Sequence, residues 1–336
     1  MNKSKFKAPF TLKQHTPIIH FKSGQSGATL RATELKPKFD RFLLENIADI
    51  PFIKNANDHR SLEYKVTITT SGQSEKGDPN HSLYFANNSA KRDEFKHTLK
   101  SSGIKVTFFS YKTDLIKLIT RYFNDFLLIT NFGARSTKGY GSFSDDIDNA
   151  EKILKQYYSM VFRVSDVGKI EKWEDKVDNI HKRLKSGINF RTYHKSLLFQ
   201  YMCTKNIRWE KRKIKEEFPS LATGKLPIDC NTRGEYRYIR AMLGTAGINE
   251  YDRGNETVTI DGGVIERFAS PITYKIIGNS IYLLGDRSYE EIMNKPFEFV
   301  HKNNNFSINT PSKNEFDLYE FLKFVENQEN IISEVN

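Results

Sequence analysis

The sequence predicts an α+β fold with helices on one face of an antiparallel sheet, as in ferredoxin-like folds. Two patterns support this class. Apolar and polar residues alternate over 62–69 and again over 104–109, which is typical of half-buried strands. Over 35–47 and 113–129, apolar residues recur at three- and four-residue spacing, which is typical of helices with one buried face.

The predicted elements follow one another as strand, helix, strands, helix. The first strand is expected over 10–21, and Pro37 is tolerated in the first turn of the helix behind it. Further along, one apolar stripe from Trp173 to Leu184 predicts a charged, amphipathic helix. Gly278-Asn279 between two β-rich runs predicts a hairpin. A short helix is expected over 315–325.

The composition indicates a folded, basic protein. The 336 residues are 38% hydrophobic and 13% aromatic, which is ample for a packed core and excludes wholesale disorder. Lys and Arg outnumber Asp and Glu by 52 to 41, for a net charge of +11. This surplus favours a polyanionic partner, although a basic surface without a ligand explains it equally well.

The two cysteines, Cys203 and Cys230, have neither C-x-x-C spacing nor flanking histidine pairs, so we expect no disulfide framework and no zinc module. Residues 1–9 are polar and basic and lack the apolar stretch of a secretory signal. No run of the sequence approaches the length of an apolar membrane span. These features predict a cytoplasmic protein with reduced thiols and no contact with a membrane.

The most informative segment runs from Phe132 to Phe143 and reads F-G-A-R-S-T-K-G-Y-G-S-F. Its three glycines allow the backbone to approach a ligand closely, and Arg135 and Lys138 are suited to phosphate contacts. Exposed N–H groups in such a loop can bind an anion, and Tyr140 could stack on a base. The alternative is an ordinary Gly-rich turn. The segment is neither a Walker A nor a dinucleotide-binding sequence.

This segment resembles the glycine-rich signature of the RAMP superfamily, the RRM-like proteins that build class 1 CRISPR effectors. His15–His20 (H-T-P-I-I-H) is similar to the first strand of that family, and Gly27–Thr33 (G-A-T-L-R-A-T) to its loop and helix start. Arg267–Ile272 (R-F-A-S-P-I) resembles its late Ser-Pro strand. Within the superfamily these features, with Arg237–Gly244, best resemble the first subunit of Cmr (type III-B) complexes.

The resemblance implies a non-catalytic RNA-binding subunit of a ribonucleoprotein in antiviral defence, without a cofactor or metal. It implies two ferredoxin-like units, an N-terminal domain over 1–164 and a C-terminal portion over 231–336, with a helical insertion over 165–230 between them. Its expected partners are guide and target RNA and other type III RAMP subunits. The residues expected to bind RNA are Arg31, Gly133, Arg135, Ser136, Lys138, Gly139, Tyr140, Gly141 and Arg267.

Three other groups of residues have competing interpretations. His15 or His20 could act as the general base of an endoribonuclease, since RAMP relatives include such enzymes, but a histidine in an early strand is more often structural. The carboxylates Asp145, Asp146 and Asp148 are more typical of a solvated turn or helix cap than of a metal site. The basic run 208–215 is either an RNA-contacting helix face or solvated charge.

Overall fold

The computed structural model describes residues 5–19, 29–51, 53–54, 60–72, 74–76, 98–165, 172–190, 192–221, 230, 233–245, 249–253, 256–263, 265 and 267–335. The chain forms two compact units. Unit one consists of Met1–Tyr157 with Tyr274–Tyr282, and unit two consists of Tyr158–Thr273 with Leu283–Asn336.

Unit one is a mixed α/β unit. Its elements in chain order are β1 (Lys7–Gln14), β2 (Ile18–Ile19), α1 (Ala32–Asn46), β3 (Ile53–Lys54), β4 (Arg60–Ser61), β5 (Lys65–Thr70), β6 (Ser74–Lys76), β7 (Thr98–Ser101), β8 (Ile104–Phe109), α2 (Thr113–Ile129), the 3-10 turn η1 (Ser136–Lys138), β9 (Phe143–Ser144) and α3 (Ala150–Tyr157). It also contains the tip of a hairpin formed by β17 (Ile272–Ile277) and β18 (Ser280–Gly285).

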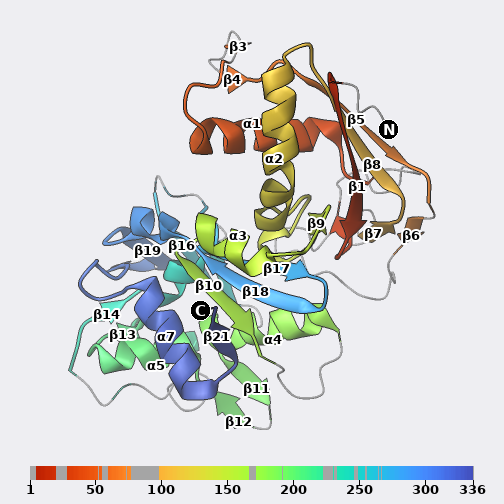
Figure 1. The fold of residues 1–336 in the computed structure, drawn as a ribbon. Helices are drawn as coiled ribbons and strands as arrows, with labels where there is room; N and C mark the ends of the chain where they lie inside the picture. Colours follow the sequence, from red (N-terminus) through yellow and green to blue (C-terminus); the bar gives the residue numbers. More distant parts are fainter. Residues whose placement is uncertain are drawn as a thin grey trace. The chain divides into compact units, whose positions relative to one another are not determined.

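The main sheet of unit one has the strand order β5-β8-β1-β9. Its three strand pairings are antiparallel: β8 pairs with β5 on one side and with β1 on the other, and β1 also pairs with β9. In chain order these strands are β1, β5, β8 and β9. The first of them, β1, therefore lies between the third, β8, and the fourth, β9. Helices α1 and α2 pack against this sheet (Figure 1).

An aromatic cluster forms the core between these helices and the sheet. Phe39 of α1 lies 5.7 Å from Phe108 of β8 and 5.3 Å from Phe123 of α2, measured between ring centroids. All three side chains are fully buried. Because burial of aromatic rings contributes much of the free energy of folding, this cluster fixes the helices on the sheet.

Unit two contains the rest of the elements. They are β10 (Met160–Val164), α4 (Trp173–Lys185), β11 (Ile188–Phe190), β12 (Thr192–His194), α5 (Leu197–Thr204), β13 (Arg208–Trp209), α6 (Glu210–Glu217), η2 (Pro219–Leu221), β14 (Tyr236–Arg237), η3 (Ile239–Leu243), β15 (Asn249–Arg253), β16 (Glu256–Asp261), η4 (Arg287–Ile292), β19 (Pro296–His301), β20 (Asn304–Asn309), α7 (Leu318–Glu329) and β21 (Ile332–Glu334), together with the ends of β17 and β18.

Two four-stranded sheets are formed by these strands. One has the order β17-β18-β10-β21. Its first strand in chain order, β10, again lies between the third, β18, and the fourth, β21. The other is the antiparallel sheet β15-β16-β19-β20. Helix α5 lies beside α7 (Figure 1), where the rings of Tyr201 and Phe321 are 5.6 Å apart.

Several sequence-based predictions are confirmed element by element. The predicted helices correspond to α1, α2, α4 and α7, and the alternating runs contain β5 and β8. Val177, Ile180 and Leu184 of α4 are buried, as the stripe predicts. The first strand is different from the prediction, because it ends at Gln14 and resumes only at Ile18, after the proline that lacks a backbone N–H group.

The units divide the chain differently from the predicted three parts. Helices α4, α5 and α6 occur within the predicted insertion, interrupted by the β11–β12 hairpin, and they group with the C-terminal part in unit two. In the chain they lie between the first and second strands of the sheet that contains β10. The mixed α+β class is observed.

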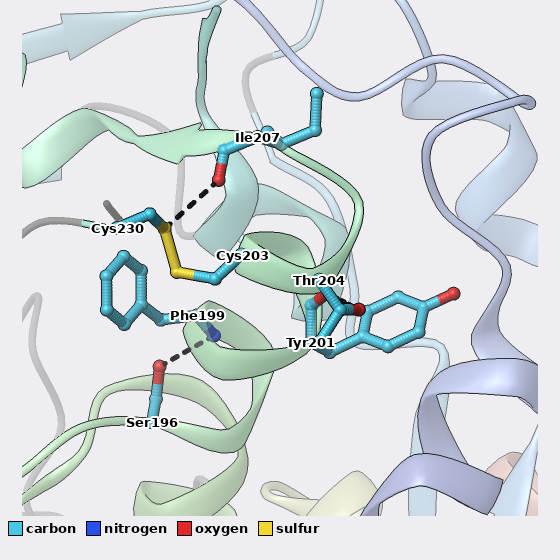
Figure 2. The surroundings of a disulfide bond; sticks show 7 residues. All are labelled: Ser196, Phe199, Tyr201, Cys203, Thr204, Ile207 and Cys230. Carbon is cyan, nitrogen blue, oxygen red and sulfur yellow. Dashed lines mark hydrogen bonds between the residues drawn. A yellow bond between two sulfur atoms is a disulfide. The ribbon is translucent and has the colours of Figure 1, made fainter. Parts of the chain in front are cut away.

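The expectation of reduced thiols is wrong in this structure. Cys203, near the end of α5, and Cys230 form a disulfide with their Cα atoms 5.6 Å apart (Figure 2). The Sγ atom of Cys230 also lies 3.6 Å from the carbonyl oxygen of Ile207. The fold brings together two residues that are 27 positions apart, a through-space contact that motif spacing does not reveal.

Within the described part of the chain, no helix is both long enough and apolar enough to cross a membrane.

Candidate nucleic-acid interface

The Gly-rich segment is a closed loop between α2 and β9 in unit one. The N–H group of Phe132 donates to the carbonyl of Gly141 at 2.9 Å, which closes the loop at its base. At its tip, Arg135 adopts left-handed backbone angles (φ 56°) and precedes the single turn η1. The loop therefore has one defined conformation, with Arg135 and Lys138 at the two ends of a tight turn.

The segment from Thr16 to Ile19 holds this loop through its backbone and one hydroxyl. Ala134 donates its N–H to the carbonyl of Ile19 at 2.9 Å, and Gly141 donates to that of Pro17 at 2.8 Å. The Thr16 hydroxyl donates to the carbonyl of Gly139 at 2.6 Å and accepts from the N–H of Ser142 at 2.9 Å. The H-T-P-I-I-H motif and the Gly-rich motif are thus held together by direct hydrogen bonds.

Helix α1 supports the loop from another side. The carboxylate of Glu34 accepts the N–H of Gly133 at 2.7 Å and forms an ion pair with Lys38 at 3.0 Å. Lys38 in turn donates to the carbonyl of Asn131 at 3.1 Å, just before the loop. Arg31 is the residue immediately before α1, one turn from Glu34. The start of α1, and with it Arg31, therefore lies close to the loop.

The tip of the loop retains groups that suit an anion. Among the described residues, the N–H groups of Ser136 and Thr137 donate to no other group of the chain. The half-buried Arg135 guanidinium lies 5.8 Å from the ring centre of Tyr140, and the Lys138 ammonium lies 5.9 Å from that of Tyr274. Two cations and two backbone N–H groups therefore lie on one turn, and these are groups of the kind that bind anions in proteins.

The structure corrects the expected role of Tyr140. Its side chain is 5% exposed, and the guanidinium of Arg135 lies near its ring. A buried ring offers no open face to a base, so base stacking on Tyr140 is not compatible with this conformation. Tyr140 instead helps to support Arg135.

The expected RNA-binding residues are only partly brought together. Arg31, Arg135, Ser136, Lys138 and the loop glycines all lie in unit one. Arg267 is exposed in unit two, beside Phe268, whose backbone pairs with Thr245. His20 and the start of the predicted Gly27–Thr33 motif lie outside the described residues.

Lys275 is a structural residue that sequence reasoning missed. Its fully buried ammonium donates to the carbonyls of Leu127 (2.7 Å) and Thr130 (2.8 Å), at the end of α2 where the loop begins. Burial lowers its pKa well below the usual value of a lysine. A cation at the carbonyl end of a helix is favourable, and these contacts fix the position from which the loop departs. The only sequence signal is a lysine within the apolar run I-T-Y-K-I-I.

His15 makes structural contacts with both ring nitrogens. Nδ1 accepts the N–H of Gly278 at 3.2 Å, and Nε2 is 2.9 Å from the hydroxyl of Ser144. Burial, followed by the positive charge of Lys275, lowers the pKa of His15 from 6.5 to about 4. An imidazole with both nitrogens occupied by protein groups is poorly placed to take a proton from a substrate.

The acidic residues behind the loop form a hydrogen-bonded turn. The side chain of Asn124 accepts the N–H groups of Asp145 and Asp146, each at 3.0 Å. Asp146 itself accepts the N–H groups of Ile147 (2.6 Å) and Asp148 (3.1 Å). This arrangement is that of a capped turn ahead of α3.

Several cations of the basic run 208–215 form ion pairs with carboxylates of α6. Arg212 lies 2.7 Å from Glu216, and Lys213 lies 2.5 Å from Glu217, each one turn further along α6. Arg208 lies over the ring of Tyr236 at 4.0 Å. These ion-paired residues carry a balanced charge pattern, which favours a solvated face. Lys215 of the same run is buried, so only part of the run has this character.

Comparisons with known proteins identify the family of the chain. The model of the Cmr1 N-terminal domain matches residues 5–188, and that of the Cmr1 C-terminal domain matches residues 193–336. The crystal structure of Cmr1 from Pyrococcus furiosus in its apo form is similar, with a TM-score of 0.44, 13% identity and 98% of each chain covered. No curated protein matches the chain.

The two domain matches together span nearly the whole chain, and the first alone covers more than half of it. They define a RAMP subunit of a CRISPR effector. The chain belongs to the Cmr1 family and is a subunit of the type III-B Cmr CRISPR complex.

Proposed function

We propose that the chain is a non-catalytic RNA-binding subunit of the Cmr complex, and that the Gly-rich loop holds the phosphate backbone of guide or target RNA. The main support for this proposal is the arrangement of groups at the tip of the loop. Arg135 and Lys138 flank a turn on which the N–H groups of Ser136 and Thr137 have no acceptor among the described residues. A phosphate oxygen at this turn would accept from both backbone and side chains.

The supports around the loop favour a preorganised site. Hydrogen bonds from the Thr16–Ile19 segment and from Glu34 fix the loop before any ligand binds. Preorganisation lowers the entropy lost on binding, so a short loop with two cations can bind phosphate usefully. Arg31 at the start of α1 is a third cation of unit one that we expect to contact the RNA. Arg267, in unit two, stays a predicted RNA contact of its own.

The fold suits this function. In the sheets β5-β8-β1-β9 and β17-β18-β10-β21, the strand that comes first in the chain, β1 or β10, lies between the third and the fourth. A helix precedes the second strand and another precedes the fourth, which is the βαββαβ order of ferredoxin-like folds. We infer that the chain contains two ferredoxin-like units, with helices inserted into the second. RRM domains share this architecture and bind RNA on it.

We propose a non-catalytic role because His15, one of the two candidate general bases, is poorly suited to accept a proton. Its imidazole is neutral near pH 7 and engaged at both nitrogens, and Gly278 and Ser144 occupy the positions that a substrate proton would need. The histidine base of the endoribonuclease alternative therefore has no support from His15.

The test uses the purified chain, labelled single-stranded RNA and excess EDTA. We expect a shifted band in a native gel and intact RNA in a denaturing gel. Cut RNA that disappears in the His15→Gln variant would establish the nuclease instead. RNA that remains unshifted at micromolar protein would contradict the binding proposal.

A further inference from the structure

A second surface of unit one lies between helix α1 and strands β4 and β5. It is a cleft of about 1150 Å³. The α1 residues that line it recur at four-residue spacing: Ala32, Thr33, Lys36, Pro37, Asp40, Arg41, Leu44 and Glu45. Glu34 and Lys38, which hold the Gly-rich loop, are absent from this lining. The cleft is therefore separate from the candidate RNA site.

Strand β5 borders the cleft and is the last described strand on its side of the sheet. In the order β5-β8-β1-β9, β5 is the outermost strand, and its far side pairs with no other described strand. Lys65, Thr67 and Thr69 of β5 are exposed. An open strand edge presents unpaired backbone donors and acceptors, which is the basis of recognition by strand addition.

The lining favours a polypeptide over single-stranded RNA. Pro37, Leu44 and Val66 supply apolar surface. Its aromatic residue, Tyr64, is 6% exposed and has the Lys36 ammonium 3.8 Å from its ring centre. No open aromatic face is therefore available in the lining for a base, although such faces supply much of the affinity for single strands.

The charges of the cleft indicate the chemistry of its occupant. Lys36 is paired with Asp40 at 2.8 Å. Of the other charged lining residues, Arg41 and Lys65 are cations and Glu45 is a carboxylate, while Arg60 is a cation that already interacts within the chain. This surplus of positive charge complements an acidic segment, and it disfavours a basic one.

We propose that the α1–β5 cleft binds an extended, acidic segment of another protein subunit of the Cmr complex. The segment pairs with the outer edge of β5, which no other described strand occupies, and places its side chains in the cleft. This inference follows from membership of the complex and does not depend on RNA binding by the Gly-rich loop.

The first test places a photo-crosslinking residue, benzoyl-phenylalanine, at Thr67 in the complete complex. Irradiation is expected to link the chain to a second protein subunit, at a peptide that mass spectrometry identifies as acidic. The same substitution at Lys117, exposed on α2, controls for random linkage. Linkage to RNA alone would assign the cleft to RNA, and the absence of any adduct would overturn the proposal.

The second test reverses charge. Arg41→Glu with Lys65→Glu should reduce incorporation into the complex at least tenfold, relative to Lys117→Glu with Lys155→Glu, which makes the same net change on exposed positions away from the cleft. RNA affinity of the isolated chain should agree within twofold between the two double variants. Equal incorporation of both would contradict the proposal even if RNA binding holds.

Discussion

Gly141 lies against the carbonyl group of Phe132 so closely that a Cβ atom built on Gly141 would be 1.9 Å from that oxygen. The same pair of residues closes the Gly-rich loop by a backbone hydrogen bond of 2.9 Å. Gly141 also has a φ of +70°, which L-residues rarely adopt. Both the close approach and the backbone angle therefore require glycine at this position.

We predict that Gly141→Ala lowers the free energy of unfolding by more than about 3 kcal/mol, because steric overlap is added to the cost of the left-handed angle. Gly263→Ala is the matched control. Gly263 has a φ of +62° but no atom within 4 Å of a built Cβ, so only about 1–2 kcal/mol is expected there. Denaturant titrations of both variants measure the difference. Equal losses would show that the close approach to Phe132 is unimportant.

The neutral state of His15 predicts a specific pH dependence of stability. Below its ordinary pKa of 6.5, the unfolded chain takes up a proton that the folded chain, with a pKa of about 4, does not. The free energy of unfolding should therefore fall, by up to about 3 kcal/mol, as the pH drops from 6.5 to 4. Above pH 6.5 this contribution is fully present and constant.

His15→Gln should flatten this dependence, whereas replacement of the exposed His194 by Gln should leave it as in the parent. Thermal or urea unfolding at half-unit pH steps measures it. If the parent and His15→Gln lose stability in parallel between pH 6.5 and 4, the buried, hydrogen-bonded role of His15 is wrong.

The pairing of Cys203 with Cys230 is open to direct chemical test. Iodoacetamide in denaturant without reductant should add no mass, and after reduction it should add two groups. By the chain-entropy argument, a bond across 27 positions should stabilise the fold by roughly 3–4 kcal/mol. Reduction should lower stability accordingly. The double variant with serine at both positions should be insensitive to reductant. Two alkylated cysteines before reduction would show that the thiols are free.

Elements whose signals are local were predictable from the sequence. The apolar periodicities of α1, α2 and α4 predict helices because each buries one face, and Gly278-Asn279 predicts the β17–β18 turn because glycine accepts its positive φ. The Gly-rich segment was recognisable as a loop that suits a ligand, because glycines and cations are adjacent in the chain.

The supports of that loop were not predictable, because they come from distant parts of the chain. The hydroxyl of Thr16 reaches Gly139 across 123 positions, and Lys275 reaches Leu127 across 148. Neither a threonine nor a lysine indicates from sequence which distant carbonyl group it will contact. The burial of Tyr140 was missed for the same reason, since its surroundings are set by tertiary packing and not by its neighbours in sequence.

We propose above all that Arg135 and Lys138 hold RNA phosphate, and the salt dependence of RNA affinity tests this role most directly. A charge-assisted contact to phosphate contributes roughly 1.5–3 kcal/mol, so losing both cations should weaken binding at least tenfold. The comparison is between Arg135→Ala with Lys138→Ala and the charge-matched Lys117→Ala with Lys155→Ala, at several salt concentrations and with RNAs of unrelated sequence.

Thermal unfolding of both double variants should stay close to that of the parent, since half-buried or exposed cations contribute little to packing. In a plot of log affinity against log salt, the loop variant should lose about 1.5–2 units of slope, equally for every RNA, because each phosphate contact releases condensed counterions. The control variant should keep nearly the parental slope. An unchanged slope and affinity in the folded loop variant would contradict the assignment of this loop to RNA.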